Sequence, residues 1–375
     1  MGRSFDVAIA GAGIVGSACA DECSAAGLTV AIAEPGPIGG GATAAGMGHL
    51  VVMDDSPAQI ELTRYSCELW RELARDLPSD VEYVAAGTVW VAADDEEMAE
   101  VERKRRVYEG IGVRAEVLDE NQLAEAEPNL RPGLAGGLLV PDDAVVYPPC
   151  AARFLIERAK SRGAVVLRAA VTQLSGEGLA LRDGSRIPAG ITINATGAWA
   201  PQFAHDLEVR RRKGHLVITD RYPGFVRHQL VELGFLKSAH SISTDSVAFN
   251  VQPRRTGQLL IGSSRQFGVE ESAIDSPMLT RMLERAIEYM PRIADVIAIR
   301  SWTGFRAATP DNLPLIGPSI ADARTFLATG HEGLGITTSL ATGRLIADQI
   351  LGRRPAIPFE PYLPARQPEK AEHHA

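Results

Sequence analysis

Residues 5–16 read FDVAIAGAGIVG, and this stretch decides the fold. The apolar run 5–10 predicts a short, buried parallel strand. A helix-like stretch follows and extends to Gly27, which we expect at the C-terminal end of the helix. A second apolar run, residues 29–33, ends at Glu34. Strand, glycine turn, helix and strand in this order predict a βαβ unit.

The turn between the first strand and the helix has the spacing G-x-G-x-x-G, at Gly11, Gly13 and Gly16. In that spacing the first glycine makes the tight turn, the second lets the backbone approach a pyrophosphate, and the third permits close helix–strand packing. The phosphates are then expected on the first amides of the helix, around Ile14 and Val15. The motif predicts a dinucleotide site.

Glu34 indicates which dinucleotide is bound. It follows Gly16 by 18 residues and ends the second strand. A carboxylate there accepts hydrogen bonds from the ribose hydroxyls of an adenosine and repels a 2′-phosphate, which argues against NADP. A glycine-rich turn without a ligand is the alternative, and the presence of strand, turn, helix and carboxylate together argues against it.

Further glycine-rich segments favour FAD over NAD, because a simple NAD dehydrogenase needs only the first site. The loop 40–46 follows Glu34 closely, residues 195–199 offer a second backbone approach, and residues 330–337 open a helix. The N-terminus of that helix is suited to stabilise negative charge on a reduced flavin. The predicted cofactor contacts beyond the first motif are Thr43, Ala44, Ala45, Gly46, Met47, Val171, Ala195, Thr196, Gly197, Trp199, Gly330, His331, Gly333, Leu334, Gly335, Ile336 and Thr337.

Composition limits the class of protein. The 375 residues suit about two domains, and 45% hydrophobic with 23% charged residues is typical of a globular chain. The net charge of −9 disfavours a nucleic-acid partner. The four cysteines form no CxxC pair, so we predict no metal site, no disulfide framework and a cytoplasmic location. The longest apolar stretch, 7–20, is too short to span a bilayer.

Helix–strand alternation at the two ends of the chain flanks a strand-rich middle. This pattern predicts an α/β fold with two domains that interleave in sequence: a Rossmann-like FAD-binding domain and an antiparallel-sheet substrate-binding domain. We assign residues 1–83, 141–205 and 301–355 to the first domain, and residues 84–140 and 206–300 to the second. Residues 356–375 are Pro-rich and polar, which predicts a loosely held tail.

Patterns of charge and capping predict several further elements. Ser56 followed by Pro57 indicates a helix start, and the charged stretch 95–110 indicates a helix. The basic residues 103–106 on that helix are expected to face solvent. The basic run 210–213 is interpreted as a solvated lead-in to a strand. Other expected strands are 84–92, 213–220, 246–252 and 258–263, and other expected helices are 119–127, 150–162 and 276–290.

The chain as a whole resembles the FAD-dependent D-amino-acid oxidase superfamily. That group includes glycine oxidase, sarcosine oxidase and the amino-acid-oxidising subunits of D-hydroxyproline dehydrogenase, opine oxidase and hydrogen cyanide synthase. The resemblance implies an FAD domain capped by a large antiparallel sheet, and oxidation of a C–N bond next to a carboxylate. The segments that carry it are Val7–Glu34, Gly41–Leu50, Asp119–Pro128, Ile193–Trp199, Lys213–Gly214 (a turn near the domain crossing in the family), Gly304–Pro318 and Gly330–Asp348.

The resemblance also implies a catalytic residue. The segment GFRAATPD, residues 304–311, matches the one whose arginine clamps the substrate carboxylate, which points to Arg306. A planar guanidinium grips a carboxylate bidentately and so orients the neighbouring carbon. A structural arginine paired with a core carboxylate is the alternative. His49 lies just beyond the flavin loop; it either lines the active site, as a second catalytic candidate, or packs under the loop.

Two departures from relatives with covalent flavin imply noncovalent FAD. Sarcosine-oxidase-like members carry a cysteine at about the place of Gly304, and dimethylglycine-dehydrogenase-like members carry a histidine at the place of Thr43. Neither attachment residue is present at these positions in this sequence.

The stretches AAGMGHLVVMDD, GFRAATPDNLPLIGP and GHEGLGITTSLATGRLIADQ look closest to D-hydroxyproline dehydrogenases. This resemblance implies hydride transfer from Cα of a cyclic secondary D-amino acid, cis-4-hydroxy-D-proline or D-proline, to flavin N5. Glycine, sarcosine or an opine are alternative substrates. A non-catalytic flavin electron-transfer subunit is a further alternative, against which Arg306 argues. Oxygen, a quinone or a partner subunit remain open as electron acceptors, and an iron–sulfur centre would have to lie on a partner.

Overall fold

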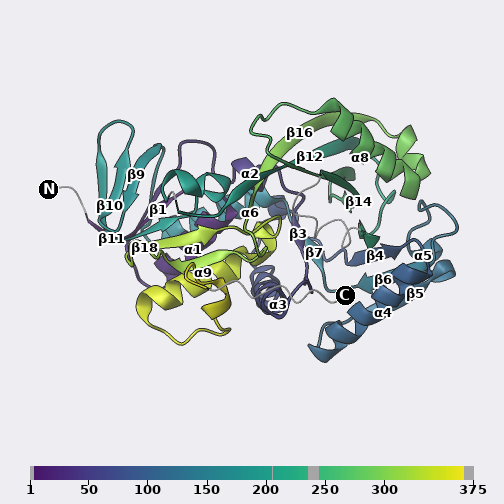
Figure 1. The fold of residues 1–375 in the computed structure, drawn as a ribbon, viewed down its shortest axis with the longest axis horizontal. Coiled ribbons are helices and arrows are strands. Elements are labelled where there is room, and N and C mark those ends of the chain that lie inside the picture. Colours follow the sequence, from purple (N-terminus) through teal and green to yellow (C-terminus); the bar gives the residue numbers. More distant parts are fainter. Residues whose placement is uncertain (1–3, 205, 235–244, 367–375) are drawn as a thin grey trace.

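The computed structural model describes residues 4–204, 206–234 and 245–366 (Figure 1). Two large sheets lie at opposite ends of the long axis in Figure 1, and segments of the chain pass back and forth between them. A short pairing of β3 (His49–Leu50) with β7 (Ala144–Val145) lies between these two sheets. None of the helices in the described ranges is long and apolar enough to cross a membrane.

The first sheet contains the predicted βαβ unit. β1 pairs in parallel with both β2 and β11, and β11 pairs in parallel with β18. β1 and β2 are almost wholly buried, as expected for strands covered on both faces. In order across the sheet the strands are β17 (Leu315–Pro318), β18 (Thr325–Thr329), β11 (Arg186–Asn194), β1 (Phe5–Ala10), β2 (Val30–Ala33) and β8 (Val165–Leu167), with β9 (Val171–Ser175) and β10 (Gly178–Leu181) extending from β11.

Helices pack closely around this first sheet. α1 (Ile14–Ala25) contacts both α6 (Pro148–Ser161) and α9 (Gly335–Leu351), and α9 also contacts α3 (Pro57–Leu73). A side chain at Gly343 of α9 would lie 2.6 Å from the carbonyl oxygen of Ala18 in α1, so a glycine lets these two helices approach. The Ser56 hydroxyl accepts a hydrogen bond from the Gln59 amide, which confirms the predicted cap of α3.

The second sheet is antiparallel except for the parallel pair β13 and β4. α8 (Ser276–Tyr289) packs against β14 and β15, where the Tyr289 ring stacks on Phe249 at a centroid distance of 4.7 Å. In order across the sheet the strands are β16 (Ala298–Ala308), β12 (Arg210–Arg221), β15 (Gln258–Phe267), β14 (Ser246–Pro253), β13 (Gln229–Glu232), β4 (Thr88–Ala92), β6 (Gly136–Val140) and β5 (Glu116–Asp119).

Two expectations from the sequence, a domain boundary and a turn, differ from this arrangement. β16 belongs to the second sheet, so the predicted domain boundary at residue 301 cuts through a strand. The pair Lys213–Gly214 lies inside β12 and pairs with β16 and β15; the expectation of a turn there is wrong. Both errors concern strands whose membership is set by long-range pairing, which the local sequence does not show.

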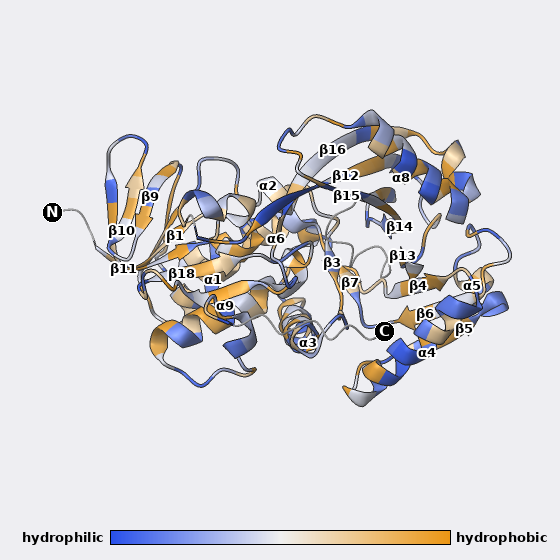
Figure 2. Cartoon of the chain, in the orientation of Figure 1, coloured by the Kyte–Doolittle hydropathy of each residue, from blue (hydrophilic) through white to orange (hydrophobic). Residues whose placement is uncertain are grey.

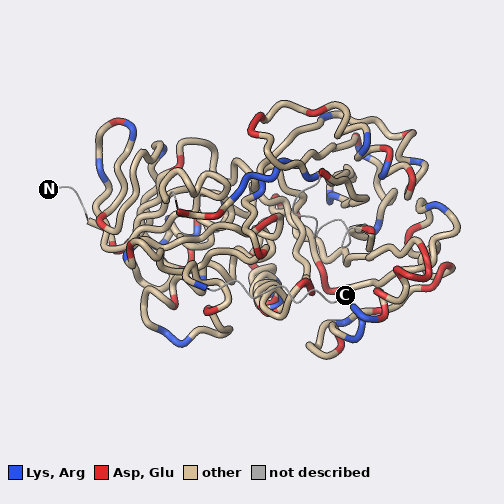
Figure 3. Tube along the Cα trace, viewed as in Figure 1, with Lys and Arg blue, Asp and Glu red and all other residues tan. Residues whose placement is uncertain are grey.

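The helix α4 (Asp95–Gly110) is confirmed, but its basic residues do not all face solvent. α4 is mostly hydrophilic and carries interleaved charges, whereas β4 and β6 beside it are hydrophobic (Figures 2 and 3). Lys104 is nevertheless fully buried, and it forms an ion pair with buried Asp54. Its ammonium also lies over the Trp90 ring, 4.3 Å from the centroid. A buried lysine is tolerated here because its charge is paired.

Arg212 and Lys213 correct the interpretation of the second basic run. Each is only 2% exposed. Arg212 pairs with buried Glu332 at 2.8 Å, and Lys213 donates a hydrogen bond to the Ala273 carbonyl at 2.5 Å. Arg212 and Lys213 therefore belong to the interior of the second sheet, whereas Arg210 is exposed and Arg211 is half-buried.

The segment 356–366 corrects the prediction of a loose tail. Tyr362 is completely buried and donates a hydrogen bond from its hydroxyl to the Ala58 carbonyl at 2.6 Å. Arg366 forms a two-point ion pair with Asp311, at 2.7 and 2.8 Å. These contacts hold the segment against α3 and the loop before β17. Residues 367–375 lie outside the described residues.

Candidate functional site

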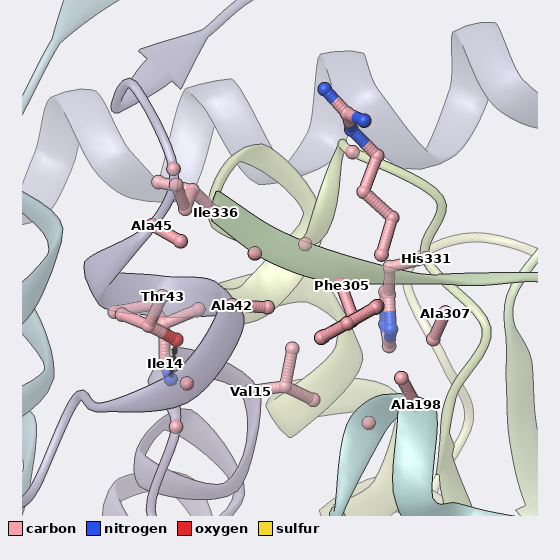
Figure 4. Close-up of a pocket in the computed structure, with 18 of the residues that line it drawn as sticks. Ile14, Val15, Ala42, Thr43, Ala45, Ala198, Phe305, Ala307, His331 and Ile336 are labelled. Carbon is pink, nitrogen blue, oxygen red and sulfur yellow. Dashed lines mark hydrogen bonds between the residues drawn. The ribbon is translucent and has the colours of Figure 1, made fainter. Parts of the chain in front are cut away.

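One large cavity, about 770 Å³, is lined by residues of both sheets. Nearly all the predicted site residues line it, including Arg306 and His49. The exceptions are Gly16, Ala44 and Thr337. Figure 4 shows the wall formed by the start of α1, the loop around Thr43 and the strand carrying Phe305, with His331 beside Ala307. The fold therefore brings together four segments that are far apart in the sequence.

The glycines of the first motif leave no room for side chains. Gly11 has a φ of +98°, and a Cβ there would lie 2.7 Å from the carbonyl oxygen of Ala195. A Cβ on Gly16 would overlap the carbonyl oxygen of Gly11, which explains why this residue packs beneath the cavity and does not line it. The turn therefore presents bare backbone to the cavity, as a bound pyrophosphate requires.

Thr43 joins the flavin loop to the helix N-terminus. Its hydroxyl oxygen accepts a hydrogen bond from the Ile14 amide at 2.9 Å, which Figure 4 marks with a dashed line. Thr43 lies in the short helix α2 (Gly41–Ala44), and its side chain is buried. This contact satisfies one free amide of α1 and fixes the loop across the cavity.

The Glu34 carboxylate is held by the backbone beside the cavity. One oxygen accepts from the Ala12 amide at 2.9 Å, and the other accepts from the Gly36 amide at 2.8 Å. A carboxylate has about four acceptor positions, so two stay available for the hydroxyls of a ribose. The residues present thus fit the adenosine and pyrophosphate parts of FAD.

The third glycine-rich loop, residues 330–335, leads into α9. His331 is buried in it, and its Nε2 lies 3.0 Å from the Thr342 hydroxyl of α9. Burial lowers the pKa of His331 to about 3, so the ring is neutral at physiological pH. Thr337 donates a hydrogen bond to the His49 carbonyl at 2.8 Å, which ties α9 to β3 and explains its place outside the cavity wall.

Arg306 reaches the cavity from β16. Its guanidinium lies against the backbone of Gly214 on β12, and one Nη1–H donates to the Ser264 carbonyl at 3.0 Å. Burial lowers the pKa of Arg306; nearby Glu332 opposes this effect, and nearby Arg212 adds to it. An arginine stays protonated in proteins, so its charge is poorly solvated here and an anionic ligand would stabilise it.

Comparison with known proteins shows the family of this chain. Residues 6–349 match the family model described as DAO, FAD dependent oxidoreductase. The chain belongs to the DAO family of FAD-dependent oxidoreductases.

Relatives of known name cover nearly the whole length of this DAO-family chain. It is 29% identical over 379 residues to a glycine oxidase of Geobacillus kaustophilus, covering 96% of this chain and 97% of that protein. It is 28% identical over 430 residues to the hydrogen cyanide synthase subunit HcnC of Pseudomonas aeruginosa, and the match covers 99% of this chain and 98% of that protein. A D-amino acid dehydrogenase of Methylobacterium nodulans is 27% identical over 325 residues, and the match covers 82% of this chain and 73% of that protein.

Solved structures show the same fold. The crystal structure of the Geobacillus kaustophilus glycine oxidase has a TM-score of 0.87 with this DAO-family chain at 28% identity, covering 98% of this chain and all of that one. The crystal structure of an L-proline dehydrogenase from P. horikoshii has a TM-score of 0.85 at 22% identity, covering 97% and 98%, which is a likeness of fold alone. The protein is therefore an FAD-dependent oxidoreductase acting on amino acids.

Sequence reasoning missed the residues that hold Arg306 in this DAO-family site. Ser264 offers its carbonyl to Arg306, and its hydroxyl oxygen lies 2.9 Å from both the backbone amide and Nδ1 of His215. His215 Nε2 accepts from the Asp275 amide at 3.0 Å, so Nδ1 carries the proton and donates to Ser264. These residues are brought together by β-sheet pairing, and no local motif marks them.

Two more arginines of the second sheet line the same cavity. Arg212 is paired with Glu332, whose backbone has a φ of +31°, and Arg265 lies close to both Arg306 and Glu332. Burial and the charge of Arg306 lower the pKa of Arg265 to about 9, whereas Glu332 and Asp55 oppose that effect. Three cations against two carboxylates favour an anion in this part of the cavity.

His49 lines the cavity from β3, and both alternatives for it remain predictions. Burial lowers its pKa to about 3, so the ring is neutral. Its Nε2 is buried and has no hydrogen-bond partner within the described ranges. Across the same ranges, no three His, Cys, Asp or Glu side chains gather to hold a metal ion.

Proposed function

We propose that this protein oxidises the Cα–N bond of a D-amino acid whose carboxylate binds Arg306. The observation that carries the proposal is the place of the Arg306 guanidinium, in the cavity that the three cofactor loops also line. A bidentate clamp on the carboxylate fixes the direction of the adjacent Cα–H bond. Bound FAD would supply the oxidation by accepting the hydride, and the Gly11–Gly16 turn, Glu34, the loop around Thr43 and the 330–335 loop would hold it.

The chain's own part is binding, orientation and exclusion of water. Arg306 is pre-positioned by Ser264 and Gly214, so little conformational entropy is lost when a carboxylate binds. His49 and His331 are neutral, which leaves the cationic charge of the site on the arginines. Because the substrate amine reacts in its neutral form, no protein base is required, and the imino product hydrolyses or cyclises after release.

For the substrate we propose a cyclic secondary D-amino acid, cis-4-hydroxy-D-proline or D-proline. The sequence resemblance to D-hydroxyproline dehydrogenases supports this assignment, and so does the D-amino acid dehydrogenase among the relatives. Glycine is favoured instead by the glycine oxidases among the relatives, and it is the second candidate together with sarcosine and opines. The relative named as a subunit of hydrogen cyanide synthase supports a partner subunit as one possible electron acceptor.

A flavin subunit that only relays electrons is the competing function. Such a subunit has no use for a carboxylate clamp held by a dedicated hydrogen-bond network. Replacing Arg306 with Ala separates the two functions. Under the proposal, anaerobic bleaching of the flavin by the best amino acid falls by at least about a hundredfold in rate, whereas the FAD content of the purified protein is unchanged. Unchanged bleaching would refute the assignment of Arg306.

The screen that identifies the substrate uses the purified holoprotein without oxygen. D- and L-amino acids, including proline and hydroxyproline isomers, glycine and sarcosine, are added one at a time while flavin absorbance is followed. Arg306→Lys serves as a matched variant, because it keeps the charge but loses the bidentate geometry. We expect it to bleach more slowly than the wild type and faster than Arg306→Ala.

A further inference from the structure

Three polar side chains of the second sheet line the cavity, and in the described residues each carries a buried polar atom without a hydrogen-bond partner. They are Trp90 on β4, Gln229 on β13 and Asn250 on β14, and we call this set the polar wall. Trp90 is 2% exposed and Gln229 is 1% exposed. In the part of the chain that the structure describes, Trp90 Nε1, Gln229 Oε1 and Asn250 Oδ1 are buried and accept or donate no hydrogen bond.

Strand register places the polar wall on one face of the sheet. Val231 of β13 pairs with Trp90 on one side and with Asn250 on the other, so these side chains stand in one row. Gln229 precedes Val231 by two residues on the same strand and therefore points to the same face. All four residues line the cavity, which confirms that this face looks into it.

The polar wall begins on the strand next to the one that holds the carboxylate clamp. The Arg306 guanidinium reaches over β12 and hydrogen-bonds to the carbonyl of Ser264 on β15. β14, which carries Asn250, is the next strand after β15. Adjacent strands are about 4.8 Å apart. Asn250 therefore lies about one strand spacing from the strand of Ser264, Gln229 about two and Trp90 about three, and all three line the cavity that Arg306 also lines.

Contact with Lys104 fixes the indole of Trp90. The Lys104 ammonium lies over its ring, and Lys104 is itself fixed by the buried ion pair with Asp54. A donor fixed in this way cannot turn to seek another partner. Leaving a buried donor unpaired costs about 1–3 kcal/mol, so a ligand group that accepts from Trp90 Nε1 is favoured over an apolar group that covers this donor.

We propose that the substrate's side chain carries a hydroxyl group, which the polar wall recognises. This inference rests on the proposed amino-acid oxidation. A hydroxyl can accept from Trp90 Nε1 and donate to Asn250 Oδ1 or Gln229 Oε1, so it suits a wall with both kinds of group. A second carboxylate can only accept, and it would face the two carboxamide oxygens. Glycine or sarcosine would leave all three atoms without a protein or substrate partner.

The test compares amino acids that differ only by the hydroxyl. The pairs are D-proline with cis-4-hydroxy-D-proline, D-alanine with D-serine, and D-2-aminobutyrate with D-homoserine. For each pair, the holoprotein's anaerobic flavin-bleaching rate and the calorimetric binding affinity are measured. We expect at least one pair to favour the hydroxylated member by about tenfold or more. D-aspartate and D-glutamate are added as acidic competitors.

Variants then test whether the polar wall causes the preference. Trp90→Phe removes the N–H and keeps an aromatic ring under Lys104, and Asn250→Leu removes the carboxamide at similar volume. Each is expected to lower the preference for the hydroxyl by about fivefold to tenfold, with little change for the unsubstituted partner. Thr88→Val is the matched control, because Thr88 is buried two residues from Trp90 and does not line the cavity; it should leave the preference unchanged.

The outcomes separate the two proposals. If amino acids bleach the flavin but no pair favours the hydroxyl, or if an acidic member is best, the hydroxyl inference is wrong and the oxidation stands. If Trp90→Phe and Asn250→Leu both keep the wild-type preference, the polar wall is not the recognition element. If no amino acid bleaches the flavin, the proposed function fails. The calorimetric affinities of the amino-acid pairs then still test the hydroxyl inference. Equal affinities within every pair, or no binding, would overturn it.

Discussion

Arg306 lies in the space that a side chain on Gly214 would occupy. A Cβ built on Gly214 would be 2.5 Å from Nη1 of Arg306 and 2.9 Å from its Cζ. The guanidinium therefore lies flat against bare backbone of the neighbouring strand, with Ser264 accepting from it on the next strand. The absence of a side chain at residue 214 is part of the carboxylate site.

Replacing Gly214 with Ala should displace the guanidinium without disturbing the cofactor loops. Because a shift of about 1 Å at a positioning group can cost about a hundredfold, we expect kcat/KM for the amino acid to fall by about tenfold to a hundredfold. FAD content and its visible spectrum should stay as in the wild type. Gly110→Ala is the control, since a Cβ at Gly110 meets nothing within 4 Å; equal kinetics for the two variants would contradict the role of Gly214.

We expect Lys104 to stabilise the folded chain, although it lies in a charged helix. Lys104→Met leaves the buried Asp54 carboxylate without its main partner, which should lower the free energy of unfolding by about 3–5 kcal/mol. Arg106→Met, at a side chain that is 71% exposed, should change it by less than about 0.5 kcal/mol. Denaturant unfolding measures both values. Adding Asp54→Asn to Lys104→Met should restore part of the loss, and no restoration would argue against the pair.

Asp143 predicts a pH dependence of stability. Burial raises its pKa to about 7, although the charge of Lys104 acts against this shift. The pKa of an unfolded Asp is about 3.9, so the folded chain binds this proton more tightly. The free energy of unfolding should therefore fall as the pH rises from about 4 to about 7, by at most about 1.4 kcal/mol per pH unit from this residue.

Asp143→Asn isolates this effect, because the variant cannot ionise at that position. We expect the difference in unfolding free energy between variant and wild type to move in favour of the variant as the pH is raised from 5 to 8. Denaturant titrations at several pH values measure it. If the unfolding free energies of the two proteins change equally with pH, Asp143 is already ionised at low pH in the folded chain.

Noncovalent attachment of FAD is a further prediction. The Thr43 hydroxyl is committed to the Ile14 amide, and a Cβ on Gly304 would overlap the Cβ of Ala45, so neither position offers a side chain for a flavin bond. Acid precipitation of the protein should leave the yellow colour in the supernatant. A yellow pellet that keeps its colour after washing would show a covalent link.

The sequence alone determined the features that depend on contiguous residues. The glycine spacing at residues 11–16 and Glu34 at the end of the next strand predicted the βαβ unit, because the constraints on a tight turn act over neighbouring residues. The cap at Ser56 and the helix 95–110 were predicted for the same reason. Arg306 was found through a short segment that resembles a known family.

Only the tertiary structure decided which charged groups are buried and what holds them. Lys104 meets Asp54 across 50 residues, Arg212 meets Glu332 across 120, and Tyr362 meets Ala58 across 304. Ser264 and Gly214 reach Arg306 through strand pairing, and the polar wall exists because β4, β13 and β14 are neighbours. Burial and pairing are properties of the whole packed chain, since a charge enters the interior only where a distant residue supplies its partner.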